Sequence, residues 1–297
     1  LSQALIEIGE AAFMGCSSLT SMTIPESVRA VNRVAFHGCI NVASINIPAS
    51  VYFLGDNVFP NRIDVDEDNP VFSSLEGILF NKSKTKLIHY PVNRTGSYNI
   101  PLSVTYIKDN SFAGCSGLTA VNLSSNVETI GYWAFGNCTG LDTVIIPPSV
   151  KYIDVQAFYN CTGLTAVFSQ STTPAVLGSS FGMKVFENID FTGCVLYVPF
   201  GSSGIYAATD QWKDFLTIVE MPEMKLSEHK LSVPAAGDTI KIAVSTNLSW
   251  NINSDKSWLK LSPESGIGSD TITFLAEANP SYITRYATAT ISAAGVL

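Results

Sequence analysis

The stretch "AFMGCSSLTSMTIPESV" (residues 12–28) decides the fold, because a close copy follows 23 residues later as "AFHGCINVASINIPASV" (residues 35–51). The Ala-Phe pair, the Cys and the Ile-Pro pair keep their places in both. Self-similarity at a fixed period of about 20–50 residues is the signature of a repeat architecture. The phenylalanine of this pattern recurs at Phe13, Phe36, Phe59, Phe112, Phe135 and Phe158. The step from 59 to 112 equals two periods plus seven residues, which predicts embellished coils at about residues 60–100.

Each copy also contains the spacing L-x-x-L-x-L, as in Leu19-x-x-Met22-x-Ile24. The alternating half of this pattern predicts a short strand with one buried face, and the proline that follows at Pro25 ends it. One coil cannot bury its own Phe, Leu and Ile, so successive coils must stack to form a continuous core. The sequence therefore predicts a mainly β solenoid of 23-residue coils with little helix.

The cysteines follow the same period, which predicts a column of thiols that points into the core. Buried Cys behaves as a small hydrophobe, so we expect a reduced structural ladder rather than disulfides. Cys194 falls outside the period and is expected to be buried as well. The sequence has no C-x-x-C motif, which makes a zinc site improbable. The repeat positions are Cys16, Cys39, Cys115, Cys138 and Cys161.

The pattern "AFxGCxxLTxVxIPxSV" resembles the BspA-type leucine-rich repeats of bacterial surface proteins, which are numerous in Bacteroidetes. The resemblance covers about residues 1–220. It extends to the embellishment, where the residues themselves predict a hairpin of Ile78–Phe80 and Leu87–Tyr90. Residues 175–220 lose the period, and their aromatic side chains predict a cap on the end of the core. These aromatic residues are Tyr206, Trp212 and Phe215. We assign residues 1–222 to this first domain.

After "EMPEM" the sequence changes to short runs of alternating apolar and polar residues, spaced every 8–12 residues. This pattern predicts an antiparallel β-sandwich over residues 223–297. This segment resembles a BACON domain, an immunoglobulin-like module of Bacteroidetes. The resemblance implies a carbohydrate-binding role. Such modules have one more strand after "ATATIS", so we expect this sandwich to lack its last strand or to be cut short. The matching positions are Trp250, Trp258, Pro263, Gly266 and Arg285.

Net charge and hydropathy exclude some classes of binding partner. The net charge is −8 and only 14% of residues are charged, which argues against nucleic acid and anionic lipid as partners. No stretch of about 20 apolar residues is present, so no membrane span is expected. The chain opens inside the repeat pattern. We interpret it as a monomeric fragment of an exported protein of the outer-membrane or extracellular surface, with its signal peptide and anchor outside the fragment.

Chemistry-bearing motifs are few. The three histidines, His37, His89 and His229, lie in separate segments, and no G-x-S-x-G, H-E-x-x-H or P-loop motif occurs. We therefore expect neither an enzyme nor a cofactor.

"DVDEDN" has the 1, 3, 5 spacing of a calcium loop. However, Asn69 stands where a calcium loop has its invariant Gly, and Leu75 stands where it has the Glu of position 12. A solvated turn is the favoured interpretation and a cation site a weak alternative. The three candidate ligands would be Asp64, Asp66 and Asp68.

The outward residues of the solenoid strands form the candidate ligand surface. This face is small and uncharged, polar at one end and apolar at the other. Our leading hypothesis is a non-catalytic cell-surface interaction protein, an adhesin, which binds a protein partner through this face. The candidate residues are Ser21, Thr23, Ser44, Asn46, Asn122, Thr143, Ile145 and Phe168.

Glycan capture by the sandwich or by the Phe168 end is the alternative. Exposure of Trp250 or Trp258 in a groove would favour it, and burial would count against it. A third hypothesis, a glycoside hydrolase, requires two convergent carboxylates about 5–10 Å apart.

Overall fold

The computed structural model describes residues 1–56, 61–281 and 283–293. The chain divides into two compact units. One unit, residues 1–198 and 203–219, is a β solenoid of about nine turns, called the solenoid below. The other unit, residues 199–202 and 220–297, is the sandwich. Each is described by itself.

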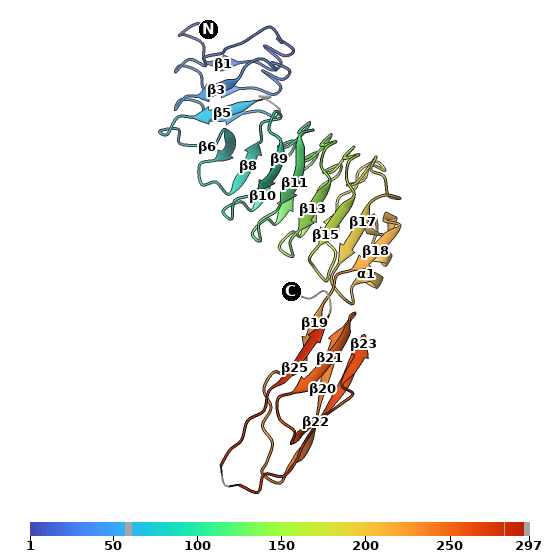
Figure 1. Cartoon of the computed structure of the whole chain (residues 1–297). Coiled ribbons are helices and arrows are strands. Elements are labelled where there is room, and N and C mark those ends of the chain that lie inside the picture. Colours follow the sequence, from blue (N-terminus) through green and yellow to red (C-terminus); the bar gives the residue numbers. More distant parts are fainter. Residues whose placement is uncertain (57–60, 282, 294–297) are drawn as a thin grey trace. The chain divides into compact units, whose positions relative to one another are not determined.

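The leucine-rich pattern builds the front sheet of the solenoid, in which strands of successive coils lie side by side (Figure 1). From β9 to β17 the neighbouring strands are parallel, as expected when each coil repeats the course of the one before. The order is β9 (Gly96–Asn99), β11 (Leu118–Asn122), β13 (Thr143–Ile146), β15 (Ala166–Ser169), β17 (Val195–Val198) and β18 (Thr217–Glu220). Upstream, β3 (Ser44–Ile47) and β5 (Arg62–Val65) form a separate parallel pair.

The other limb of each coil contributes a shorter strand to the rear sheet. Three such strands pair at the amino-terminal end, β1 (Glu7–Ile8), β2 (Ala30–Val31) and β4 (Phe53–Leu54). Five pair in parallel further on, β8 (Lys86–His89), β10 (Tyr106–Ile107), β12 (Thr129–Ile130), β14 (Tyr152–Ile153) and β16 (Val176–Leu177). The antiparallel strands β7 (Ile78–Asn81) and β6 (Phe72–Leu75) extend this sheet. The predicted hairpin is therefore confirmed as β7 and β8.

The first coil departs from expectation. The pattern predicts a front strand over Leu19–Ile24, but these residues form no strand. Ser21 and Thr23 are exposed there without strand pairing. The neighbouring strand β3 makes its pair with β5, on the side away from this coil. The front segment of the first coil, residues 19–24, therefore has no strand pairing, although the rear strand of this coil, β1, pairs with β2.

The repeated phenylalanines form the predicted internal ladder. The Phe112 and Phe135 rings stack with centroids 4.7 Å apart, and Phe135 stacks on Phe158 at 5.1 Å. All three side chains are fully buried. Phe186, which the period did not predict, continues the stack at 5.1 Å from Phe158. Phe59 lies outside the described residues.

The cysteine column is present, and its thiols fill space and also form hydrogen bonds between coils. The thiol of Cys138 donates a hydrogen bond to the Phe112 carbonyl of the preceding coil, and Cys161 bonds Phe135 in the same way, each at 3.1 Å. All six cysteines are free, and all except the exposed Cys16 are buried. Burial raises the pKa of the Cys161 thiol to about 12, which keeps it protonated and able to donate.

Each coil turns through residues of positive φ. Gly114, Asn137 and Asn160 occupy one such place in three successive coils, with φ of 76°, 58° and 55°. Glycine and asparagine adopt this left-handed conformation at least cost. The repeat therefore uses Gly or Asn here for backbone geometry.

The predicted cap closes the carboxyl-terminal end of the solenoid core. Its residues form the helix α1 (Ser203–Ala208) and the short 3-10 helix η1 (Trp212–Asp214). The side chains of Tyr206, Trp212 and Phe215 are buried in the same cluster as the phenylalanine ladder. The Trp212 indole also donates a hydrogen bond to the Ala175 carbonyl at 2.9 Å.

The sandwich consists of two antiparallel sheets around one small core. One sheet has the order β19 (Met224–Leu226), β20 (Asp238–Thr246), β24 (Asp270–Ala276), β22 (Leu259–Ser262). The other has the order β23 (Ser265–Ile267), β21 (Ser249–Ser254), β25 (Ala289–Ala293). The expected further strand would follow β25, outside the described residues.

Candidate functional site: the front face of the solenoid

Strand register aligns the outward side chains of the front sheet in two rows, which we call the front face. Side chains alternate between the two sides of a strand, so every second residue faces out. The first row is Ser97, Ala120, Thr143, Ala166 and Val195. The second row is Asn99, Asn122, Ile145, Phe168 and Tyr197. Neither row contains a charged residue.

The β9–β11 half of the front face is polar. Asn122 Nδ2 donates a hydrogen bond to Asn99 Oδ1 at 2.7 Å across the two strands. Both side chains are exposed. This half therefore presents amide groups that are already ordered by each other.

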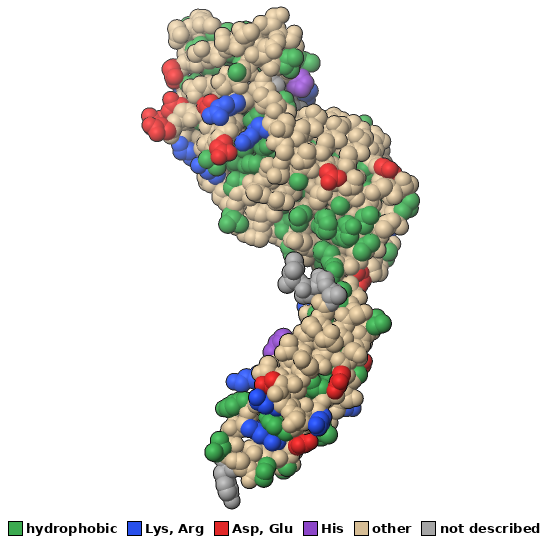
Figure 2. Space-filling view, viewed as in Figure 1, with side chains coloured by type: hydrophobic (Ala, Val, Ile, Leu, Met, Phe, Trp, Pro, Cys, Tyr) green, Lys and Arg blue, Asp and Glu red, His purple; other side chains and the backbone are tan. Residues whose placement is uncertain are grey.

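The β13–β18 half is apolar. The Phe168 ring stacks on Tyr197 with centroids 4.5 Å apart and planes within 8°. Val219 of β18 is 40% exposed. Figure 2 shows hydrophobic side chains gathering over this part of the face. We call Ile145, Phe168, Val195, Tyr197 and Val219 the apolar end.

Tyr197 was not among the residues expected from the sequence. It follows Phe168 by 29 residues rather than 23, so the period does not reach it. The signal that identifies it is the alternation in "VLYV", which places Tyr197 opposite to Leu196 and Val198. The aromatic group of the front face is therefore a pair of rings, where the sequence suggested Phe168 alone.

Upstream, the pair β3 and β5 places the remaining candidate residues. Ser44 lies opposite Arg62, and Asn46 lies opposite Asp64. Arg62 Nε and Nη2 donate to the two carboxylate oxygens of Asp64 at 2.9 and 2.7 Å. This contact raises the pKa of the Arg62 guanidinium. Ser44 and Asn46 therefore neighbour an ion pair rather than an extension of the uncharged rows.

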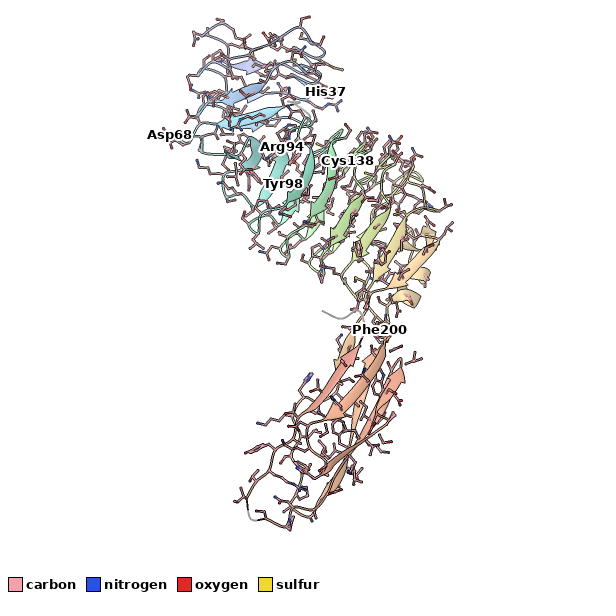
Figure 3. All side chains as sticks on the ribbon, in the orientation of Figure 1. His37, Asp68, Arg94, Tyr98, Cys138 and Phe200 are labelled. Carbon is pink, nitrogen blue, oxygen red and sulfur yellow. The ribbon has the colours of Figure 1, made fainter. Side chains whose placement is uncertain are left out.

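The calcium-like spacing does not produce a convergent site. Both oxygens of Asp64 face Arg62, while Asp66 Oδ1 accepts a hydrogen bond from the Asp68 backbone N–H at 2.9 Å. Asp68 is exposed at the outer edge of its loop (Figure 3). Within the described ranges, no group of three His, Cys, Asp or Glu side chains is placed to hold a metal ion. The arrangement is that of a turn.

The important residue of this loop is Asn69, which is completely buried. Its Nδ2 donates to the carbonyls of Pro48 and Val51, both at 2.9 Å. Its Oδ1 accepts from the backbone N–H groups of Val71 and Phe72 at 2.9 and 2.8 Å. Asn69 thus ties the loop to the preceding coil.

The histidines offer no catalytic arrangement. Burial lowers the pKa of His89 to about 4, and its Nε2 lies 3.3 Å from the Asn61 carbonyl oxygen. A neutral His89 ring therefore donates one structural hydrogen bond. His37 and His229 are exposed, in a turn of the solenoid and in the sandwich respectively.

The two tryptophans of the sandwich are covered to different degrees. Trp250 is 3% exposed and its indole donates to the Gly268 carbonyl at 2.9 Å. Trp258 is half-buried, with the Arg285 guanidinium 3.9 Å from its ring centroid. By the criterion stated above, the burial of Trp250 counts against glycan binding on that ring.

A pocket of about 420 Å³ lies beside β21 and β22, with Asp255 and Glu264 among its lining residues. A hydrogen bond from the Thr288 backbone N–H lowers the pKa of Asp255. Asp255 is therefore ionised at neutral pH. A general acid for glycoside hydrolysis requires the opposite shift.

No helix in the described residues is long and apolar enough to cross a membrane.

Comparisons with known proteins agree with the architecture. The family model described as "BspA type Leucine rich repeat region (6 copies)" matches residues 1–95 and 90–199. The model described as "Viral BACON domain" matches residues 223–296. The search of curated proteins gave no match.

Among solved structures, the chain is similar to the pneumococcal vaccine antigen PcpA, with 24% identity and a TM-score of 0.54 over 73% of this chain. It is similar to a leucine-rich repeat protein of Eubacterium ventriosum at 22% identity and a TM-score of 0.48 over 66% of this chain. It covers 66% of the PcpA chain and 64% of the Eubacterium chain, just under two thirds of each. The PcpA likeness supports the fold.

The repeat model accounts for well over half of the chain, and the residues that it matches include the Phe and Cys ladders of the solenoid core. The chain belongs to the BspA-type leucine-rich repeat family.

Proposed function

We propose that this chain is a non-catalytic cell-surface interaction protein that binds a protein partner through the front face. The main support is the apolar end, where Phe168 and Tyr197 stack with part of each ring in solvent. Aromatic side chains surrounded by smaller polar and apolar ones are typical of the energetic centre of a protein interface. Depletion of charge at such a centre is typical as well.

The fixed register of the front strands favours binding. The rows of the front face are held in register by backbone hydrogen bonds between parallel strands. A partner would therefore meet side chains that are already positioned, so little ordering entropy is lost on association. Asn99 and Asn122 would form the polar rim of the same interface.

Location at the cell surface is part of this proposal. It rests on membership of the BspA-type family together with the resemblance to bacterial surface proteins. Protease treatment of intact cells that express the full-length protein tests it. A surface protein loses its solenoid under conditions that leave cytoplasmic enzymes intact.

The binding experiment uses the whole chain against purified extracellular-matrix proteins and a glycan array. The test variant replaces both rings, Phe168→Ser with Tyr197→Ser. The control, Val176→Ser, removes a side chain that is 64% exposed on the rear sheet. We expect affinity for a matrix protein to fall about tenfold or more in the double variant and to be unchanged in the control.

Two results contradict the proposal. One is binding to a matrix protein that the double variant retains, which would place the interface elsewhere. The other is an array result in which only glycans bind. If that glycan binding is lost with Phe168 and Tyr197, the alternative function, glycan capture at this end of the solenoid, replaces the protein-binding one.

A further inference from the structure

The two rows of the front face differ in the size of their side chains. On β9 to β15 the first row holds small side chains, while the second row ends in the stacked rings of Phe168 and Tyr197. The rows lie two residues apart on each strand, which is about 7 Å. A low row of side chains therefore runs beside a higher one. The small members of the first row are Ser97, Ala120, Thr143 and Ala166.

The spacing of the strands sets the period of both rows. Neighbouring strands of a sheet lie about 4.8 Å apart, and the ring centroids of Phe168 and Tyr197 lie 4.5 Å apart. Two strand spacings therefore measure about 9.6 Å. A ligand that lies along the rows makes the same contacts again only if its own structure repeats at this distance.

The polyproline II helix has a matching repeat. It rises about 3.1 Å per residue with three residues per turn, so one turn measures about 9.3 Å. Residues i and i+3 of such a segment then stand two strands apart, with a mismatch of about 0.3 Å. An α-helix has a pitch of about 5.4 Å, which departs from the strand spacing by about 0.6 Å at every strand. The period of the rows therefore favours a polyproline II segment.

The charge of the rows agrees with such a ligand. Neither row contains a charged residue. Asp142, which precedes the row residue Thr143, accepts hydrogen bonds from the hydroxyl groups of Thr143 and Thr165. A charged side chain pressed against the rows would lose its hydration without gaining a partner. Proline is apolar and uncharged, so it meets this surface without that cost.

The hydrogen-bonding groups of the second row are donors at its two ends. In the described part of the chain, Asn99 Nδ2 and Tyr197 Oη have no hydrogen-bond partner. They stand on β9 and β17, four strand spacings or about 19 Å apart. Six residues of polyproline II cover about the same 19 Å, and the carbonyl groups of this helix have no internal hydrogen bonds. One segment can therefore accept from both ends of the row.

We infer that the front face binds a single polyproline II segment of its protein partner, with prolines at i and i+3 on the first row beside Phe168 and Tyr197. This inference rests on the proposed function and names the class of segment that the front face recognises. A polyproline II helix is already extended before it binds, so the complex loses little conformational entropy.

The probe is fluorescein-labelled deca-L-proline, titrated with the whole chain by fluorescence anisotropy. A labelled decapeptide of alternating glycine and serine is the control, because it is uncharged, of the same length and flexible. We expect saturable binding of deca-proline and none of the glycine–serine peptide.

The decisive variant is Ala166→Leu. It adds three carbons to the first row and keeps the stack of Phe168 and Tyr197, so a loss of binding reports on the path of the ligand. Thr129→Leu is the matched control, since it places the same side chain at a half-buried strand position of the rear sheet. We expect Ala166→Leu to weaken deca-proline binding about tenfold or more and Thr129→Leu to leave it unchanged. Thermal melting of each variant confirms that it is folded.

Three results would overturn the inference. The first is the absence of saturable deca-proline binding, and the second is binding that Ala166→Leu retains. The third is a triple-helical peptide of Pro-Pro-Gly repeats that binds where deca-proline does not. A matrix protein that is bound through Phe168 and Tyr197 and is not displaced by deca-proline would also overturn it, while the proposed function would stand.

Discussion

Asn69 shows how a single residue can be misjudged from sequence. In "DVDEDNP" it reads as part of a solvated turn, because acidic and amide residues before a proline are typical of loops. In the fold it is buried and makes four hydrogen bonds to backbone groups on both sides of the loop. Two of these partners are carbonyls of an earlier coil, and a linear pattern does not reveal them.

Replacing Asn69 with Ala should therefore be costly. The substitution leaves two buried carbonyls and two buried N–H groups without their partner, and we expect a loss of about 3 kcal/mol of unfolding free energy. Asn122→Ala is the matched control, because its amide is exposed and should cost under about 0.5 kcal/mol. Chemical denaturation measures both. Equal losses would mean that the Asn69 bonds contribute little.

His89 provides a pH-dependent contribution. Burial lowers its folded pKa to about 4 from an ordinary 6.5. As pH falls below 6.5 the unfolded chain takes up the proton first, so stability that is complete above pH 6.5 is lost toward pH 4.

His89→Gln keeps a donor for the Asn61 carbonyl and does not titrate. We expect its melting temperature to fall less than that of the wild type between about pH 7 and pH 4.5. Parallel decreases in the two proteins would assign the acid sensitivity to other groups.

At the scale of the element, the coil was predictable because its determinants recur. Phe, Cys and the alternating strand residues repeat at 23, and burial on one side of each strand follows from alternation. The front strand of the first coil was not predictable, because a strand also requires a neighbour to pair with. Tyr197 was missed since the chain inserts extra residues before β17, which breaks the period.

Phe135 tests the internal ladder directly. It is buried between Phe112 and Phe158, so Phe135→Ala should cost about 3–5 kcal/mol in the unfolding of the solenoid. Phe53→Ala, a ring that is 49% exposed on β4, serves as the control and should cost under about 1 kcal/mol. A loss for Phe135→Ala as small as that for the control would mean that its site collapses without a cavity.

At the scale of the whole molecule, the sequence predicted the fold class of both units, because one has a 23-residue repeat and the other has short alternating strand patterns. It also predicted that the outward face becomes apolar at Ile145 and Phe168, without indicating Tyr197. The stack of Trp133 on Tyr159 escaped prediction, because it joins side chains of two neighbouring coils. Spatial neighbours one coil apart are 23 residues apart in sequence, and their combined effect appears only when the coils stack.

The solenoid holds two core clusters and the sandwich a third, separate one, so we predict that the sandwich and the solenoid part around Phe135 unfold in different calorimetric transitions. Ile272→Ala, a fully buried change in the sandwich, should lower only one of them, and Phe135→Ala only the other. A single transition shifted by both variants would show that the units unfold together.

The hydrogen bonds between coils run from one repeat position to its equivalent, as from Phe112 N–H to the Ala134 carbonyl and from Phe135 N–H to the Ala157 carbonyl. These successive coils therefore offer one another the same edge. A recombination event that duplicates or deletes a whole coil rejoins matching edges and preserves the core. The span of the front face is thus a heritable quantity that changes in discrete steps, without new folding information.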